Sequence, residues 1–284
     1  MTKIVISKDF ATAIEKRFDK YFRFDNSKYW IKYYEKKLKK RDFKREILYA
    51  DLIASRVGKG SRVLEIGSGY GFLAKEMWRQ GLDVHCVDLF ENMLILAKKY
   101  LADTEVKIKK ADILNLPYKK KSFDCISLMS IIEHFPYNET NEDILPYVSQ
   151  FINKDGYLFI HVPISTLHSK IARFIRKYII NDLPDWAIDD DGDVTHRFWI
   201  SHKEYLTLFE HHDFDVVNFD FRLQRSNEKP HVITLLMNKI QILLSGSDEK
   251  LTTEFAQESP IIKIKKKLKS KLAVTGYYLL RKKI

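Results

Sequence analysis

A glycine-rich run at residues 63–71, Val-Leu-Glu-Ile-Gly-Ser-Gly-Tyr-Gly, constrains the fold of this chain more than any other segment. Its first four residues have strand character, and a helical stretch begins directly after it at Phe72. A strand that enters a glycine turn and leaves it as a helix lets the backbone come close to a ligand. The glycines stand at positions 67, 69 and 71, whereas a dinucleotide-binding turn would have its third glycine at position 72. The run therefore predicts a ligand-binding turn of another kind.

Strand-like and helix-like segments alternate after this turn. Strands are expected at 62–66, 83–87, 106–109, 123–129 and 156–162, and helices at 72–80, 91–101, 142–151 and 203–211. Two further strands, at 214–221 and 232–237, are expected to close the sheet as an antiparallel pair. The alternation predicts an α/β fold with a doubly wound, seven-stranded, mostly parallel sheet, an antiparallel last strand, helices on both faces and an N-terminal helical cap.

Acids and histidines follow the predicted strands at their carboxyl ends, the edge at which open α/β sheets bind ligands. A carboxylate at Asp88 can accept both ribose hydroxyls of a nucleoside, and one at Asp112 can accept from an adenine amino group, with Ile113 packing on the ring. Taken singly, the glycines could form a plain tight turn and each aspartate could be a helix cap. Their order along the chain favours a nucleoside site.

This order of motifs resembles class I S-adenosylmethionine (SAM)-dependent methyltransferases over about residues 60–240. The resemblance extends to the turn Asn153-Lys-Asp-Gly156 and to residues 195–206 and 212–217. The last two stretches resemble the late helix and strand of the subgroup that methylates small molecules, sugars and quinone or lipid precursors. The implied cofactor is SAM, and the implied acceptor is a small molecule methylated on oxygen.

The resemblance also implies roles for individual residues. Gly67, Ser68 and Gly69 would approach the methionyl part of SAM, Glu65 would lie near its amino group, Asp88 would hold the ribose and Asp112 the adenine. The complete set of implied cofactor contacts is Glu65, Gly67, Ser68, Gly69, Gly71, Asp88, Leu89, Asp112, Ile113 and Ser130.

Methylation of a hydroxyl is helped by a general base, and histidine suits neutral pH. The candidates are His134 first, His196 second and His161 third, although a histidine near a strand end can also be purely structural. The acidic run at 185–193 does not have the spacing of a calcium loop, so no metal is expected. We expect that run to be an acidic lid or a patch for a polar substrate.

Charge and apolar patterning divide the chain into three parts, 1–58 as the helical cap, 59–240 as the SAM-binding core with a lid insertion at 164–200, and 241–284 as a linker and basic C-terminal helix. Residues 1–60 hold 17 Lys+Arg against 8 Asp+Glu, and residues 261–284 hold 9 against none. Basic ends of this kind can meet phosphate on nucleic acid or on anionic lipid. A helix at 261–284 could therefore lie on a membrane surface. The preferred alternative is a helix that covers the sheet or forms a dimer contact.

Two cysteines in apolar runs, no signal peptide and no long apolar segment favour a cytoplasmic protein, with peripheral membrane contact through 261–284 as an addition. Two alternatives stay open beside the small-molecule enzyme. One is a methyltransferase of RNA or another nucleic acid, held by the basic termini and weakened by the absence of the Asn/Asp-Pro-Pro-aromatic motif. The other is a SAM-binding scaffold without catalysis.

Overall fold

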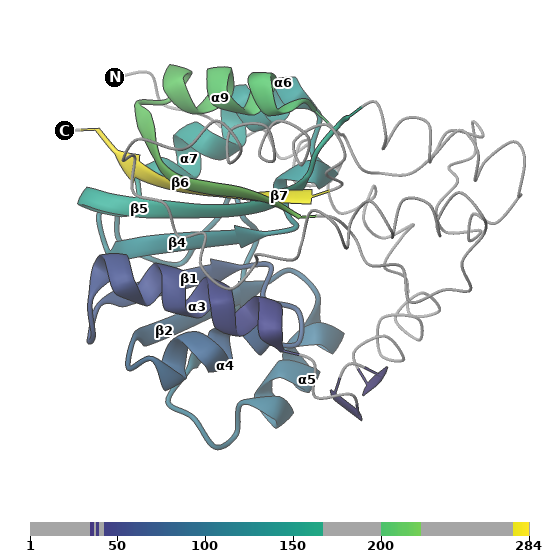
Figure 1. The fold of residues 1–284 in the computed structure, drawn as a ribbon. Coiled ribbons are helices and arrows are strands. Elements are labelled where there is room, and N and C mark those ends of the chain that lie inside the picture. Colours follow the sequence, from purple (N-terminus) through teal and green to yellow (C-terminus); the bar gives the residue numbers. More distant parts are fainter. Residues whose placement is uncertain (1–34, 37, 40–42, 167–199, 223–274, 284) are drawn as a thin grey trace, which may run out of the picture.

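The computed structural model describes residues 35–36, 38–39, 43–166, 200–222 and 275–283. They form a seven-stranded sheet with helices on both faces (Figure 1), and the strand order is β3-β2-β1-β4-β5-β7-β6. The strands are β1 (Arg62–Ile66), β2 (Asp83–Asp88), β3 (Lys107–Lys110), β4 (Phe123–Met129), β5 (Ile152–Pro163), β6 (Phe214–Arg222) and β7 (Thr275–Lys282). β7 runs antiparallel to both of its neighbours, while β1 to β5 pair in parallel. The predicted fold class is confirmed.

Helices on the two faces enclose two apolar cores. The helices are α3 (Lys44–Val57), α4 (Phe72–Arg79), α5 (Glu91–Tyr100), the 3-10 helix η1 (Ile132–His134), α6 (Tyr137–Glu139), the π-helix η2 (Thr140–Ile144), α7 (Leu145–Ser149) and α9 (His202–His211). α3, α4 and α5 pack on one face, and α7 and α9 pack on the other. Successive residues of β1 face opposite sides of the sheet. Val63 packs in the core beneath α3, α4 and α5, and Leu64 packs in the core beneath α7 and α9, so β1 is buried on both faces.

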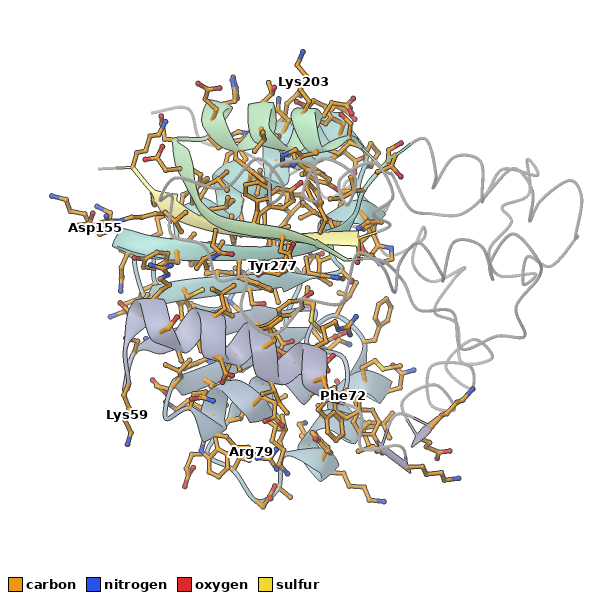
Figure 2. The ribbon with its side chains drawn as sticks, in the orientation of Figure 1. Lys59, Phe72, Arg79, Asp155, Lys203 and Tyr277 are labelled. Carbon is orange, nitrogen blue, oxygen red and sulfur yellow. The ribbon has the colours of Figure 1, made fainter. Side chains whose placement is uncertain are left out.

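Helix α3 brings the N-terminal region to the sheet. Its buried face consists of Glu46, Tyr49, Ala50 and Ile53, which recur at helical spacing. The Tyr49 ring lies 5.2 Å from the ring of Tyr277 of β7 and 5.6 Å from that of His161 of β5. Figure 2 labels Tyr277 on the sheet. Because α3 is followed directly by β1, its first residues lie near the carboxyl ends of the parallel strands.

The C-terminal segment corrects a prediction. Residues 275–282 of the expected basic helix form strand β7, which inserts between β5 and β6. Their apolar run, with Tyr278, Leu279 and Leu280 all 0% exposed, is typical of a strand covered on both faces. The basic residues that suggested a surface helix lie mainly before residue 275, and the antiparallel partner of β6 within the described part of the chain is β7. Residues 232–237 and 261–274 lie outside the described residues.

The segment expected to be one helix at 142–151 is divided into η2 and α7. Pro146 stands at the start of α7 and has no N–H to donate to the carbonyl four residues earlier, which accounts for the wider π-turn before it. The predicted capping box at Ser201 is confirmed, since its side chain accepts from Glu204 N and the Glu204 side chain accepts from Ser201 N. Among the residues described, no helix is both long and apolar enough to cross a bilayer.

Candidate functional site

The glycine turn after β1 adopts the conformation that only glycine takes easily. Gly67, Gly69 and Gly71 have φ values of 68°, 53° and 80°, all in the left-handed region. A Cβ atom at position 67 would lie 2.0 Å from Cδ1 of Ile131, which follows β4. Glycine therefore lets the ends of β1 and β4 pack directly against each other at the carboxyl edge of the sheet.

Backbone N–H groups of this turn already have acceptors within the protein. Gly67 N and Ser68 N both donate to Val87 O, at 2.8 and 3.1 Å, and Gly71 N donates to Ser68 O at 2.8 Å. Gly69 N donates to the Asp88 carboxylate at 2.8 Å. A dinucleotide turn holds phosphate with such N–H groups. Because they are used here, the turn is poorly suited to an anion, and the surrounding carboxyl groups suit a cationic ligand.

Asp88 ends β2 beside the turn and is 6% exposed. Its Oδ2 accepts from Gly69 N and its Oδ1 from Phe90 N at 3.0 Å. Burial raises the pKa of this carboxyl, and the hydrogen bonds from Phe90, Gly69 and Leu89 partly offset that rise. An ionised carboxylate offers about four lone-pair positions. Asp88 is therefore held rigidly by the backbone and keeps acceptor capacity for two ribose hydroxyls.

Glu65 lies beneath the turn, where it is 1% exposed. Its Oε2 is 4.0 Å from Cys86 Sγ, and the Ala74 backbone of α4 hydrogen-bonds to the carboxyl group. Burial raises the pKa of Glu65 well above its ordinary value, and the charges of Glu46 and Asp88 act in the same direction. A cation bound nearby would favour the ionised form. The carboxyl group therefore fits a site that receives positive charge.

The predicted adenine end lies at the tips of β2 and β3. Asp112 stands two residues past β3, and its Oδ1 accepts from Leu114 N at 2.9 Å. Ala111 N donates to Asp88 O at 3.1 Å, which ties the two strand ends together. Ile113 is buried, and Leu89 packs partly buried against the same core. The structure thus places these residues beside Asp88 at one edge.

Three further predicted residues lie at the ends of β4 and β5. Ser130 N donates to His161 O at 2.9 Å, and Ser130 Oγ is 3.2 Å from His161 Nδ1. His134 ends η1 and is 8% exposed. His196 and the acidic run 185–193 lie outside the described residues, and the roles assigned to individual residues stay predictions. No three His, Cys, Asp or Glu side chains gather as a metal site within the described parts of the chain.

Sequence reasoning missed the contribution of α3 to this edge. Glu46 is 0% exposed, pairs with Arg45 at 2.7 Å and interacts electrostatically with Glu65. Tyr49, also 0% exposed, contacts the His161 ring. The available signal was a glutamate on the same helical stripe as Tyr49 and Ile53, since a charge on a buried stripe indicates a site or an ion pair.

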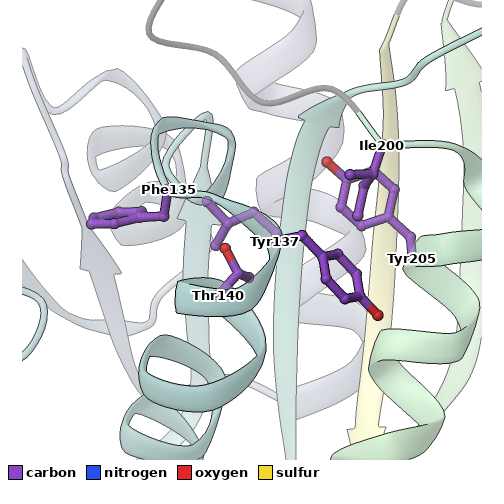
Figure 3. Close-up of a pocket in the computed structure, with 6 residues that line it drawn as sticks. Phe135, Tyr137, Thr140, Ile200 and Tyr205 are labelled. Carbon is purple, nitrogen blue, oxygen red and sulfur yellow. The ribbon is translucent and has the colours of Figure 1, made fainter.

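A shallow hollow lies next to η1, whose residue Ile132 lines it. It is open to solvent and has room for about one water molecule, and Figure 3 shows Tyr137 and Tyr205 lying near Ile200. Its lining is mainly apolar and aromatic: Ile132, Phe135, Tyr137, Thr140, Ile200 and Tyr205. Two of these residues directly flank the pair Glu133 and His134 in the sequence. The hollow is therefore next to the strand ends that carry the candidate histidines.

Residues 64–160 match the family described as Methyltransferase domain. The chain is 25% identical over 162 residues to the ubiquinone biosynthesis O-methyltransferase of Shewanella sp. (strain ANA-3), covering 54% of this chain and 63% of that protein. It is 28% identical over 144 residues to the enzyme of the same description from Xylella fastidiosa (strain M23), covering 47% and 55%. The chain thus spans less than two thirds of the length of these two curated relatives.

Solved structures are similar in fold. The magnesium protoporphyrin IX methyltransferase of Synechocystis, determined with bound SAH, has a TM-score of 0.62 at 11% identity and covers 94% of this chain and 99% of its own. A SAM-dependent methyltransferase of Methanosarcina mazei has a TM-score of 0.55 at 16% identity, with coverage of 82% and 97%. The family match and these folds confirm the predicted resemblance.

Proposed function

We propose that this chain, which matches a methyltransferase domain family over residues 64–160, transfers the methyl group of SAM to an oxygen atom of a small-molecule or lipid-linked acceptor. One observation carries the proposal. The rigidly held Asp88 lies on one side of the glycine turn, and Ser130 and His161 lie at neighbouring strand ends on its other side. A carboxylate that can hold a nucleoside and side chains that can accept a proton therefore lie at the same edge, the one at which such sheets bind ligands.

SAM fits the described residues because it is a cation at the sulfur and at the amino group. Asp88 would hold the ribose hydroxyls, Asp112 the adenine, and the turn at Gly67 and Gly69 the methionyl part. The buried Glu65 beneath the turn supports the placement of the amino group, since a neighbouring cation stabilises its ionised form. When bound, SAM supplies a methyl group already activated by the sulfonium.

The protein then has to orient the acceptor, exclude water and accept a proton. Orientation matters most, since holding the acceptor oxygen in line with the methyl carbon removes much of the entropic barrier. The acceptor hydroxyl loses its proton as the new bond forms, and a histidine can take it at neutral pH. His134 and His161 are the candidates at the described edge, and His196 is the candidate outside the described residues.

The acceptor class rests on the relatives. The hollow lined by Tyr137, Phe135 and Ile132 has room for about one water molecule, so it does not itself define an acceptor pocket. The curated relatives are named for ubiquinone biosynthesis and for O-methylation. A phenolic ring, methylated on its hydroxyl, is therefore the acceptor that we propose.

We also place the protein in the cytoplasm, because its cysteines, Cys86 and Cys125, are buried free thiols that suit a reducing compartment. Contact with an anionic membrane would have to come through residues 261–274, which hold six lysines, since β7 occupies the rest of the tail. Lysines in such a segment are attracted to anionic lipid headgroups.

Calorimetry of SAM and SAH binding tests the cofactor half of this proposal. Asp88→Asn should weaken SAM binding about 10- to 100-fold, since hydrogen bonds to a charged group are worth about 1.5–3 kcal/mol. Asp83→Asn is the matched control, because Asp83 begins the same strand at the opposite edge of the sheet. Absence of SAM binding, or equal affinity in the Asp88→Asn variant, would contradict the placement of the site.

Transfer of labelled methyl from SAM to 3,4-dihydroxybenzoate and to a prenylated catechol tests the chemistry. We expect turnover of at least one of the two and a methoxy product by mass spectrometry. Tight SAM binding without turnover of either phenol would reject the proposed acceptor class. In that case the binding-scaffold alternative would be favoured.

A further inference from the structure

Ser130 and His161 form a side-chain pair at the ends of two neighbouring parallel strands. Ser130 Oγ lies 3.2 Å from His161 Nδ1. Ser130 directly follows β4, and His161 lies within β5 near its end. The strands are already joined here by the backbone bond from Ser130 N to His161 O at 2.9 Å. The hydroxyl–imidazole bond is therefore not needed to hold the strand ends together.

Ser130 adopts an unfavourable backbone conformation at this position. Its φ is 61°, whereas L-residues other than Asn and Asp rarely enter the left-handed region. Glycine would adopt this φ without strain, as it does at three positions of the neighbouring turn. A strained residue with a polar side chain, held at a ligand-binding edge, points to a function for that side chain.

The surroundings limit what His161 can do. The residue is 4% exposed, and its ring lies against Tyr49 of α3 at 5.6 Å between ring centroids. Ser130 is partly exposed at the strand end. The serine hydroxyl is thus the accessible member of the pair, and the histidine is the buried member that can store a proton.

We propose that Ser130 and His161 act as one proton relay for the methyl transfer, an inference that rests on the proposed function. The acceptor oxygen forms a bond to the methyl carbon while the carbon–sulfur bond breaks and its electron pair stays on sulfur. The acceptor proton moves to Ser130 Oγ as the serine proton moves to His161 Nδ1. The products are the methyl ether, neutral SAH and an imidazolium at His161. This arrangement requires neutral His161 with its proton on Nε2 before each turnover.

The relay gives His161 its role through Ser130, whereas the sequence alone predicted His161 as a direct general base and Ser130 as a cofactor contact. In this role the Ser130 hydroxyl serves the acceptor rather than the cofactor. SAM affinity should therefore not depend on it. A purely structural tie predicts the opposite pattern, in which removal of either side chain lowers stability and leaves the rate constant unchanged.

The test measures kcat against pH, with saturating SAM and whichever catechol probe is turned over, in Ser130→Gly, His161→Gln and the double variant. Each single variant should lower kcat about 100-fold, the lower end of general-base effects, and leave SAM affinity within about threefold. The double variant should be no slower than either single variant, because the two groups act as one unit. The variants should recover as the phenol ionises at high pH, while the wild-type rate levels off near neutral pH.

Ser130→Gly also separates function from folding. Its thermal midpoint should equal or exceed that of the wild type, since glycine relieves the strained φ. Asp213→Gly is the matched control, because Asp213 has φ 57° in the turn before β6, at the opposite edge of the sheet. This variant should match Ser130→Gly in stability and the wild type in kcat.

Three results would overturn the relay and leave the proposed function standing: wild-type kcat in His161→Gln, single effects that multiply in the double variant, or a loss confined to SAM affinity. Wild-type protein that binds SAM and turns over neither catechol overturns the proposed acceptor class and the relay with it. Wild-type protein that does not bind SAM overturns the cofactor placement as well.

Discussion

The two halves of the sheet are stabilised in different ways. Around β1, β2 and β3, the carboxylates at the strand ends accept from backbone N–H groups of the adjacent turns, as at Asp88 and Asp112. In the half formed by β4 to β7, polar groups pair across long stretches of chain. His202 bonds Tyr278 at 2.7 Å, and Lys282 bonds Ser149 O at 2.7 Å.

The two halves therefore depend on different kinds of interaction. The half around β1, β2 and β3, where we propose that the cofactor binds and which we call the cofactor half, is built from neighbouring strand–turn–helix units and depends on local conformation. The other half depends on the return of the last residues of the chain into the middle of the sheet, where β7 separates β5 from β6. Damage to β7 should therefore unfold the protein, whereas damage to the glycine turn should act first on the ligand.

The largest expected effect concerns β7. Leu280→Ala should lower the free energy of unfolding by about 2–5 kcal/mol, since Leu280 is 0% exposed between two strands. Its neighbour Arg281, with a side chain 50% exposed, is the control, and Arg281→Ala should cost less than about 0.5 kcal/mol. Urea denaturation measures both. Equal and small losses would mean that β7 is not a structural member of the sheet.

The second expected effect concerns the turn. Gly67→Ala should cost about 3 kcal/mol, the sum of the left-handed φ and the contact with Ile131. Gly60→Ala has a similar φ of 84° with open space around it, so it should show the φ cost alone. Ile131→Ala should recover the difference in the Gly67→Ala background. Loss of SAM affinity in Gly67→Ala but not in Leu280→Ala would sharpen the contrast between the two halves.

The third effect is a pH dependence in the cofactor half. The pKa of His85 is lowered from 6.5 to about 4, mainly by burial and further by the nearby positive charge of Arg62. Between these pH values the unfolded chain binds a proton that folded His85 does not, so stability falls as the pH drops from about 6.5 and this loss levels off below about 4. The expected loss from pH 7 to pH 5 is about 2 kcal/mol.

His85→Phe removes this titration and keeps a ring against Tyr118 and Phe123, which the His85 ring meets edge-on. Denaturation at pH 7 and pH 5 should therefore show a smaller loss in the variant than in the wild type. Parallel losses in the two proteins would show that other groups account for the acid sensitivity of this half.

The smallest effect concerns the helix cap of α9. Ser201→Ala should cost about 1 kcal/mol, since the Ser201 side chain accepts from Glu204 N in a capping box. Ser201→Asp should restore most of the loss, because aspartate caps as well as serine. A cost near zero, measured by thermal denaturation, would indicate that packing against β6 and β7 alone holds this helix.

Local sequence signals were sufficient to predict the strands and the glycine turn of the cofactor half. The strand, the glycine turn and the acid at the end of β2 lie within about 25 residues, and each is specified by residue type and spacing. Apolar residue type alone is a weaker guide at α3, where Ile47 and Leu48 are exposed at 43% and 37% while Tyr49 and Ile53 are buried. An apolar stripe indicates a helix face, but only the packing partner decides which of two adjacent stripes is covered.

The sequence by itself determined the order of strands from β1 to β6, the glycine turn and the set of carboxyl and imidazole groups at the strand ends. These features follow from side-chain period, glycine conformation and chain direction, all of which act over short distances. Tertiary structure alone decided that residues 275–282 form the strand between β5 and β6, that Glu46 lies beside Glu65, and that Ser130 meets His161. Those outcomes depend on contacts between residues far apart in the chain, which no local pattern encodes.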